Sequence, residues 1–322
     1  MPPNRIVAGA ALLLVAAMLA ACNSNSPSAP PVSTHPTGHA VYSTAVDNGP
    51  WGVAISSQGL AYMTRPLTDS VAIINLSGPS VTTSFQVGNR PDDIAFNAAG
   101  TTAYVTNLND GTVGVINVAI GAQSTTYPVA GEPLRILVGP GSSSLYVTLS
   151  NGKLVVLNAS TGAAITSITI GGVPNGLALN AVASRLYVAS TAGTVTVINT
   201  TTNAPVDTFL VGGTPQDVAL IAGRNALYVA NEAGWLDIRN LTTGARTDSI
   251  PVASAFGLGV TPDGAQVWVT QSSAGRVTIV DAATAAIVDS ALTLGAPRHI
   301  AFSPLGDAAL VANEAGAGQL IQ

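Results

Sequence analysis

The sequence predicts an all-β fold, a seven-bladed β-propeller built from four-stranded antiparallel blades. Three observations lead to this prediction: a repeat of about 41 residues, short β-branched segments inside each repeat, and recurrent Gly and Asn turns between those segments. The repeat occurs seven times between Pro50 and Gln322. All but one of its units begin with proline, at Pro50, Pro91, Pro133, Pro174, Pro215, Ala255 and Pro297.

The composition agrees with this fold. Only 8% of the 322 residues are charged and 47% are hydrophobic, whereas an average soluble domain has about 25% charged residues. Blades that pack face to face bury both faces of their inner strands, which confines charge to the loops. The formal net charge of −5 and the scarcity of lysine exclude the basic surface that nucleic acids require, so we expect no nucleic-acid partner.

The N-terminus predicts export followed by lipidation. Residues 1–21 contain a single charge and one long apolar run, which is typical of a secretory signal. Residues 19–22, LAAC, resemble a bacterial lipobox, and Cys22 is the only cysteine in the chain. The resemblance implies that Cys22 becomes a lipidated N-terminus anchored in the bacterial cell envelope. The residue after Cys22 is Asn23 rather than Asp. This resembles the signal that sorts lipoproteins to the outer membrane in bacteria with two membranes.

A tether and an isolated strand follow the predicted anchor. Residues 22–39 are rich in Ser, Pro and Asn, cannot bury enough apolar surface to fold, and are expected to be disordered. The propeller is expected to occupy residues 40–322. Its last unit stops after a third strand, and the segment from His39 to Val46 has no unit of its own. We therefore predict that this N-terminal strand completes blade seven and closes the ring.

Each unit has the same internal order. In the second unit, residues 89–129, four β-branched segments are separated by turns, and the run Tyr104 to Asn107 reads YVTN. Close variants of this run recur in the later units. The pattern resembles the YVTN family of β-propeller repeats, with its YncE-like members, over essentially the whole predicted propeller. The third segment of each unit ends in Asn or Asp, which we interpret as a hairpin cap rather than a ligand.

Function must break the sevenfold pattern, because a residue type required in every unit has a structural role. The two positions after each unit head vary most and are expected to line one mouth of the central channel. They supply the candidate ligand-binding residues Trp51, Asp93, Arg135, Asn175, Asp217, Phe256 and His299. Across the surrounding loops we count eight acidic residues against four arginines, which predicts a net acidic but mixed rim. A solvated rim with Asp93 and Arg135 simply paired remains the alternative.

The residues predict neither a metal centre nor a cofactor. The chain has no His pair, Cys cluster or EF-hand loop, and its Gly-rich runs do not precede helices. An oxygen-only calcium site across the channel, from residues such as Asp93 and Asn175, stays open. His299 is the one histidine inside the predicted fold, and no nucleophile can be assigned to it from sequence.

Two functions remain. The first is a binding or scaffolding module: a lipid-anchored, monomeric propeller that presents its channel mouth to a protein, a polysaccharide or a small molecule outside the cytoplasm. The alternative is a lactone or ester hydrolase using Asp93, Asp217 and His299, an analogy with other propellers that have similar repeats.

Overall fold

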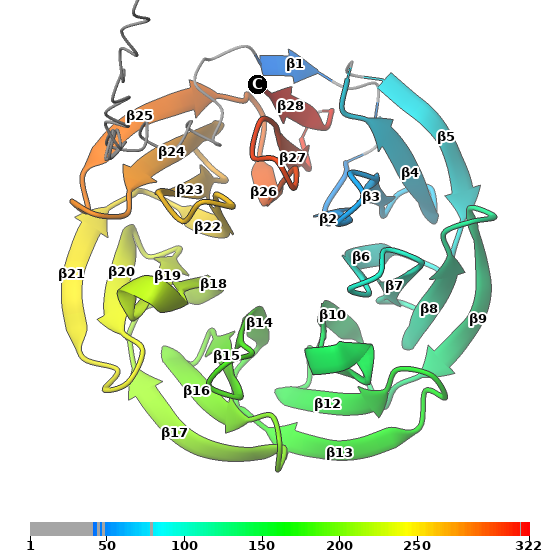
Figure 1. Ribbon diagram of the computed structural model, residues 1–322, viewed down its shortest axis with the longest axis horizontal. Coiled ribbons are helices and arrows are strands. Elements are labelled where there is room, and N and C mark those ends of the chain that lie inside the picture. Colours follow the sequence, from blue (N-terminus) through cyan, green and yellow to red (C-terminus); the bar gives the residue numbers. More distant parts are fainter. Residues whose placement is uncertain (1–40, 44–45, 47–48, 78–79, 316) are drawn as a thin grey trace, which may run out of the picture. The chain divides into compact units, whose positions relative to one another are not determined.

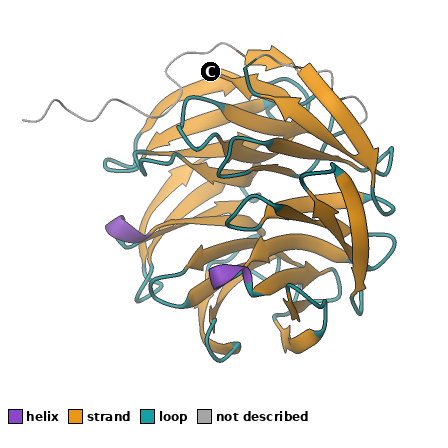
Figure 2. Cartoon of the chain, turned by 45° about the vertical axis from the view of Figure 1, so that its right-hand side comes forward, coloured by secondary structure: helices purple, strands orange, loops and turns teal. Residues whose placement is uncertain are grey.

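The computed structural model describes residues 41–43, 46, 49–77, 80–315 and 317–322. The predicted signal sequence, Cys22 and the tether lie outside the described residues. The described residues form seven four-stranded antiparallel sheets around a common centre (Figure 1), which confirms the predicted seven-bladed propeller. Almost all of the ordered structure is strand (Figure 2), and no described helix is long and apolar enough to cross a bilayer.

Strands at the same position in successive blades form concentric rings. The innermost strands are β2 (Val53–Ile55), β6 (Pro91–Phe96), β10 (Pro133–Val138), β14 (Pro174–Asn180), β18 (Pro215–Ile221), β22 (Ala255–Val260) and β26 (Pro297–Phe302). The second strands are β3 (Ala61–Arg65), β7 (Thr102–Asn107), β11 (Ser144–Leu149), β15 (Arg185–Ser190), β19 (Ala226–Asn231), β23 (Gln266–Gln271) and β27 (Ala309–Asn313).

The third strands are β4 (Ser70–Asn75), β8 (Thr112–Asn117), β12 (Lys153–Asn158), β16 (Thr194–Asn199), β20 (Trp235–Asn240), β24 (Arg276–Asp281) and β28 (Gln319–Ile321). The outermost strands are β5 (Ser80–Gln86), β9 (Ala122–Pro128), β13 (Ala164–Thr169), β17 (Ala204–Leu210), β21 (Arg246–Pro251), β25 (Ile287–Leu292) and β1 (Val41–Ser43). Two short 3-10 helices, η1 (Pro140–Ser142) and η2 (Ala222–Arg224), follow β10 and β18.

The N-terminal strand closes the ring as predicted. β1 pairs antiparallel with β28, with Val41 opposite Ile321 and Tyr42 opposite Leu320. Blade 7 therefore consists of β26, β27, β28 and β1, and contains both ends of the propeller sequence (Figure 1). Blade 1 is β2–β5, and blades 2 to 6 follow in chain order. Because β1 pairs with β28, the third strand of blade 7 has no open edge where the two ends of the propeller sequence meet.

The core lies between the blades. Buried hydrophobic residues form seven clusters, and each cluster joins side chains from two neighbouring blades. In β7 and β15 five of six residues are buried, whereas the outer strand β13 is mostly exposed. Since burial of apolar area stabilises by about 25 cal/mol per Å², these interfaces supply the main folding energy.

In blades 2 to 5 the hydroxyl of the tyrosine in the YVTN-like run ties the blade to the next one. The hydroxyl of Tyr104 donates to the carbonyl of Ala159 at 3.2 Å, and that of Tyr187 donates to the carbonyl of Leu241 at 3.1 Å. In both cases the acceptor lies in the hairpin after the third strand of the following blade. A buried phenol needs such a partner, which explains why an aromatic hydroxyl recurs there.

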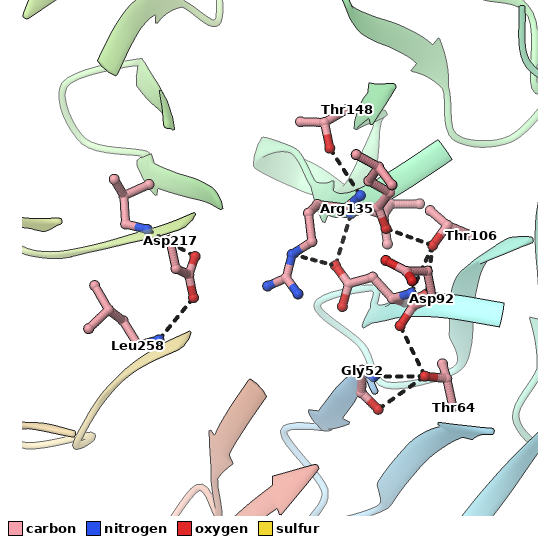
Figure 3. Close-up of polar contacts among 12 residues, drawn as sticks. Gly52, Thr64, Asp92, Thr106, Arg135, Thr148, Asp217 and Leu258 are labelled. Carbon is pink, nitrogen blue, oxygen red and sulfur yellow. Dashed lines mark hydrogen bonds and ion pairs between the residues drawn. The ribbon is translucent and has the colours of Figure 1, made fainter. Parts of the chain in front are cut away.

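The threonine of the same run ties neighbouring blades at the centre. Thr106 Oγ1 accepts the backbone N–H of Asp93 at 2.8 Å in its own blade, and donates to the carbonyl of Leu134 in the next blade at 2.9 Å. Thr64 and Thr270 make the same two bonds (Figure 3 shows those of Thr64 and Thr106). One hydroxyl thus satisfies two buried backbone groups that the sheets leave unpaired.

The Asn and Asp residues that end the third strands have the predicted role. Asn158 Oδ1 accepts backbone N–H bonds from Ser160 and Thr161, and Asp281 Oδ1 accepts them from Ala283 and Thr284. These side chains cap the hairpin turns, as their residue types predict. The bonds from Thr284 lower the pKa of Asp281.

Candidate functional site

A β-bulge sets the geometry at the channel mouth. In six blades the register between the first and second strands slips directly after the unit head. In blade 2, for example, Pro91 pairs with Asn107 and Ile94 pairs with Val105, so that Asp92 and Asp93 together oppose Thr106. A bulge of this kind breaks the regular alternation of side chains along a strand and re-aims them. In these six blades the directions of the two variable residues therefore do not follow from simple alternation.

The first residue of the pair lines the channel mouth. A cavity of about 230 Å³ lies there, and six of the seven first residues contribute to its wall, namely Trp51, Asp92, Leu134, Asn175, Gln216 and Phe256. Two second residues, Arg135 and His299, also reach it, together with the loop residues Arg90 and Leu108. We call this the mouth cavity. A neighbouring cavity of about 570 Å³ shares Trp51, Arg90 and Asp92 with it.

The second residue of most pairs faces the adjacent blade instead. A Cβ added to Gly52 would meet the backbone of Asp92 and Asp93, and one added to Gly257 would meet the carbonyl of Arg298. Glycine is therefore needed at these two positions because the innermost strands approach too closely for a side chain.

Asp93 and Asp217 are second residues whose carboxylates bridge two blades. Asp93 Oδ2 accepts the backbone N–H of Ile136 at 3.0 Å, and Asp217 Oδ2 accepts that of Leu258 at 2.9 Å (Figure 3 shows the Asp217 bond). Both side chains are buried, and neither lines the mouth cavity. Burial raises the pKa of Asp217 to about 6, although the nearby Arg135 lowers it.

An aromatic cluster forms one side of the mouth cavity. The rings of Trp51 and Phe256 pack edge to face with centroids 6.1 Å apart, and Phe256 lies 5.6 Å from the imidazole of His299. The guanidinium carbon of Arg298 is 4.5 Å from the centroids of both Trp51 and Phe256. Arg298 Nε donates to Glu314 at 2.8 Å. Cation–π and ion-pair contacts thus hold the two rings in place.

Arg135 and His299 each carry a nitrogen for which the described residues supply no hydrogen-bond partner. Arg135 Nε lies 3.4 Å from Asp93 Oδ2, which is the pairing that the sequence left open. Its Nη1 and the Nδ1 of His299 are buried and have no hydrogen-bond partner among the described residues. Burial, together with the nearby Arg135 and Arg298, lowers the pKa of His299 well below its ordinary value, so the imidazole is neutral.

Four acidic side chains of the rim accept hydrogen bonds and are not part of the wall of the mouth cavity. Asp69 and Asp110 accept backbone N–H bonds from Arg90 and Asn89. Glu132 accepts from Ser150, and Glu232 accepts from Gln216. These carboxylates organise loops, and the charge count over the whole rim therefore does not describe the cavity itself.

Asp92 is the acidic residue in the cavity wall, and its protonation is unusual. Burial raises its pKa to about 7, an effect that Asp93 reinforces and that Arg135, Arg90 and Arg298 oppose. At neutral pH a large fraction of this carboxyl is consequently uncharged. Within the described part of the chain no group of three His, Cys, Asp or Glu side chains has the geometry to hold a metal ion.

The structure thus brings together five of the seven residues selected from the sequence: Trp51, Arg135, Asn175, Phe256 and His299. It places the other two, Asp93 and Asp217, in the blade interfaces. Asp92, Gln216 and Leu134 belong to the cavity wall but were not selected. Their signal was present, because each is the first residue of a bulged pair, but the bulge itself is not visible in one sequence.

Comparisons with known proteins support the architecture. No protein-family model matches the chain, and no curated protein matches its sequence. Among solved structures, a chain of Kuenenia stuttgartiensis hydrazine synthase is similar with a TM-score of 0.77. The match has 18% sequence identity and covers 87% of this chain and 97% of that one. Similarity at this identity identifies the shared propeller fold.

Proposed function

We propose that this chain is a lipid-anchored propeller of the YVTN type, held in the bacterial cell envelope, that binds a ligand at its channel mouth outside the cytoplasm. The observation behind the binding role is the mouth cavity, where Arg135 Nη1 and His299 Nδ1 are buried and find no partner among the residues that the structure describes. Buried polar atoms are usually paired. A ligand that enters the cavity would supply the missing partners.

The geometry favours binding over hydrolysis. The hydrolase alternative requires Asp93, Asp217 and His299 to act on one substrate. The two carboxylates instead accept backbone N–H bonds between blades and lie outside the cavity wall. Their bonding explains their burial without invoking catalysis.

The ligand-binding part of the proposal is tested with the full chain purified in detergent. A library of metabolites, oligosaccharides and peptides is screened by thermal shift and tryptophan fluorescence. Leu134→Trp is designed to fill the cavity, and Val182→Trp adds the same side chain at a loop position that is 97% exposed. We expect a ligand that stabilises the wild type and Val182→Trp but not Leu134→Trp. Equal stabilisation of all three proteins, or no ligand at all, would contradict the binding role.

The anchoring part has an independent test. Cys22→Ser removes the thiol that the lipobox resemblance marks for lipidation. In a bacterial host with two membranes, we expect the wild type in the outer-membrane fraction and the variant in the soluble periplasmic fraction, since the acyl chains provide the membrane affinity. An unchanged distribution would show that Cys22 does not anchor the chain.

A further inference from the structure

We propose that the mouth cavity takes a small planar monocarboxylate, with its carboxylate held by Arg135 and His299 and its body against Trp51 and Phe256. This inference rests on the proposed function and specifies the class of ligand. It follows from three properties of the cavity wall: its unpaired nitrogen atoms, its charge, and its aromatic side.

Arg135 is prepared to bind an anion. Its backbone N–H donates to Thr148 Oγ1 at 3.0 Å, and its Nε lies 3.4 Å from Asp93 Oδ2. These contacts fix the base and one edge of the guanidinium, which extends from β10 toward the centre of the ring (Figure 3). Nη1 has no hydrogen-bond partner in the described part of the chain. A guanidinium held in this way offers its remaining N–H groups to a planar carboxylate.

His299 supplies a second group in the same wall. The side chain is more than nine-tenths buried, at 7% exposure, and no described residue gives its Nδ1 a hydrogen-bond partner. A neutral imidazole carries one N–H and can place it on either nitrogen. It can therefore donate a hydrogen bond to a carboxylate oxygen without adding a charge that burial would oppose.

The charges around the cavity favour an anion over a cation. Its charged wall residues are Arg90, Asp92 and Arg135. Asp92 is the single acidic member, and burial raises its pKa to about 7. Asp93 lies outside the wall but offsets part of the charge of Arg135, because its Oδ2 is 3.4 Å from Arg135 Nε. The excess positive charge of the wall near neutral pH is therefore that of Arg90 over a partly protonated Asp92. In a site of low dielectric this imbalance attracts a monoanion.

The aromatic side selects a flat, apolar body. Trp51 and Phe256 both line the cavity, and Arg298 is 4.5 Å from both ring centroids. Because Arg298 is held by Glu314, the rings are positioned before a ligand arrives. The cavity volume of about 230 Å³ is below the roughly 300–1,000 Å³ usual for drug-sized ligands. A molecule with one ring and one carboxylate suits this space.

Benzoate, benzamide and acetate are the probes that test the inference, using the full chain in detergent and isothermal titration calorimetry. Benzoate has both proposed features, benzamide lacks the charge, and acetate lacks the ring. We expect benzoate to bind at least about tenfold more tightly than either analogue, because charge-assisted hydrogen bonds and ring contacts each contribute. Equal affinity for benzamide, or no binding of benzoate, would overturn the inference.

Arg135→Gln is the diagnostic variant, with exposed Arg276→Gln outside the cavity as its matched control. We expect the first to weaken benzoate binding at least about tenfold and the second to leave it unchanged. If Arg135→Gln does not fold, Arg135→Lys keeps a charge beside Asp93 but loses the planar fork, and should also weaken binding. Benzoate affinity unchanged in the folded Arg135 variant would refute the assignment.

The two levels of proposal fail in different ways. A neutral ligand found in the library screen, whose binding is lost in Leu134→Trp, would support the binding function while overturning the carboxylate inference. Benzoate binding that persists in Leu134→Trp would place the anion elsewhere and also overturn the inference.

Discussion

At the residue scale, this propeller depends on single hydroxyl groups that join neighbouring blades. Thr106 serves two backbone groups from two different blades, Asp93 N–H and Leu134 C=O. The hydroxyl is fully buried, so water cannot replace it. The threonine of the YVTN-like run is thus explained by a geometric demand at the centre of the ring, where the bulge leaves these groups out of the sheet.

Thr106→Val should expose the importance of this hydroxyl. Valine keeps the shape but leaves a buried N–H and a buried carbonyl without a partner, at a cost of about 1–3 kcal/mol. Urea unfolding measures the loss. Thr125→Val, at an exposed position of β9, is the control and should change stability by less than about 0.5 kcal/mol. Equal effects of the two substitutions would contradict the bridging role.

Asp92→Asn tests the raised pKa in the mouth cavity. The native state holds this proton up to a pH of about 7, whereas the ordinary value is 3.8. Stability should therefore fall as the pH rises from about 4 to 7, because the native state then binds more protons than the unfolded chain. In the variant, the free energy of unfolding should decrease less over this pH range. At pH 7.5 the variant should be more stable than the wild type by on the order of 1–3 kcal/mol.

Asp217 and Asp93, whose pKa values burial also raises, should preserve the rest of the pH dependence. Thermal unfolding at pH 4.5 and 7.5 gives the comparison, with exposed Asp248→Asn as control. A wild-type slope retained in full by Asp92→Asn would show that this carboxyl titrates normally.

At the element scale, the third strand of blade 5, β20, has charged residues at two interface positions where the third strands of the other six blades do not. In β20, Asp237 and Arg239 are buried in the interface with blade 4, with Arg239 Nη2 lying 3.4 Å from Asp237 Oδ2. The positions equivalent to Arg239 hold Leu157 in β12 and Ile198 in β16. Asp237 Oδ1 lies 3.3 Å from Nε of the half-exposed Arg246 on the neighbouring strand β21. Arg239 Nη1 donates to the carbonyl of Gly244 at 2.9 Å, whereas Arg239 Nε has no hydrogen-bond partner among the described residues.

Replacing this pair should be less harmful than breaking it. Asp237→Val together with Arg239→Leu reproduces the residues of β12 and should be neutral or stabilising by about 1–4 kcal/mol, because two charges no longer have to be desolvated. Asp237→Val by itself should cost about 3–5 kcal/mol, because it leaves Arg239 buried without its partner. Denaturant unfolding measures the free energy of unfolding of the single and double variants. A double variant that is as unstable as the single one would contradict the argument.

At the scale of the whole molecule, stability depends on a closed ring. Each interface between blades has its own hydrophobic cluster, and β1 joins the two ends of the propeller in one sheet. In an open array the terminal blades would each lose a neighbour. Closure gives every blade two partners and removes the exposed edge of β28.

Deletion of residues 1–43 removes β1 and should open the ring between blade 7 and blade 1. Loss of the β1–β28 pairs should cost at least about 2 kcal/mol and expose an edge that promotes association. Thermal unfolding and light scattering measure the two effects. A chain that begins at Ala40, and therefore retains β1, is the control.

A rearranged chain separates strand pairing from chain connectivity. Because Val41 faces Ile321 in an antiparallel pair, residues 40–43 can be appended after Gln322 through a two-residue turn. This variant restores the sheet but not the covalent link from blade 7 to blade 1. We expect its stability to lie between that of the deletion variant and that of the chain that begins at Ala40. If it is no more stable than the deletion variant, the loss of stability comes from the broken covalent link rather than from the lost strand pairing.

The sequence by itself determined the number of blades, the strand that closes the ring, and the hairpin caps. These follow from a 41-residue period, an incomplete last unit and local turn chemistry, none of which depends on distant contacts. The tertiary structure decided which residue of each variable pair reaches the channel. It turned Asp93 and Asp217 into bridges between blades and made Asp92 a cavity residue with a raised pKa. Burial and close approach of neighbouring blades set these outcomes, and both arise between residues about 40 positions apart.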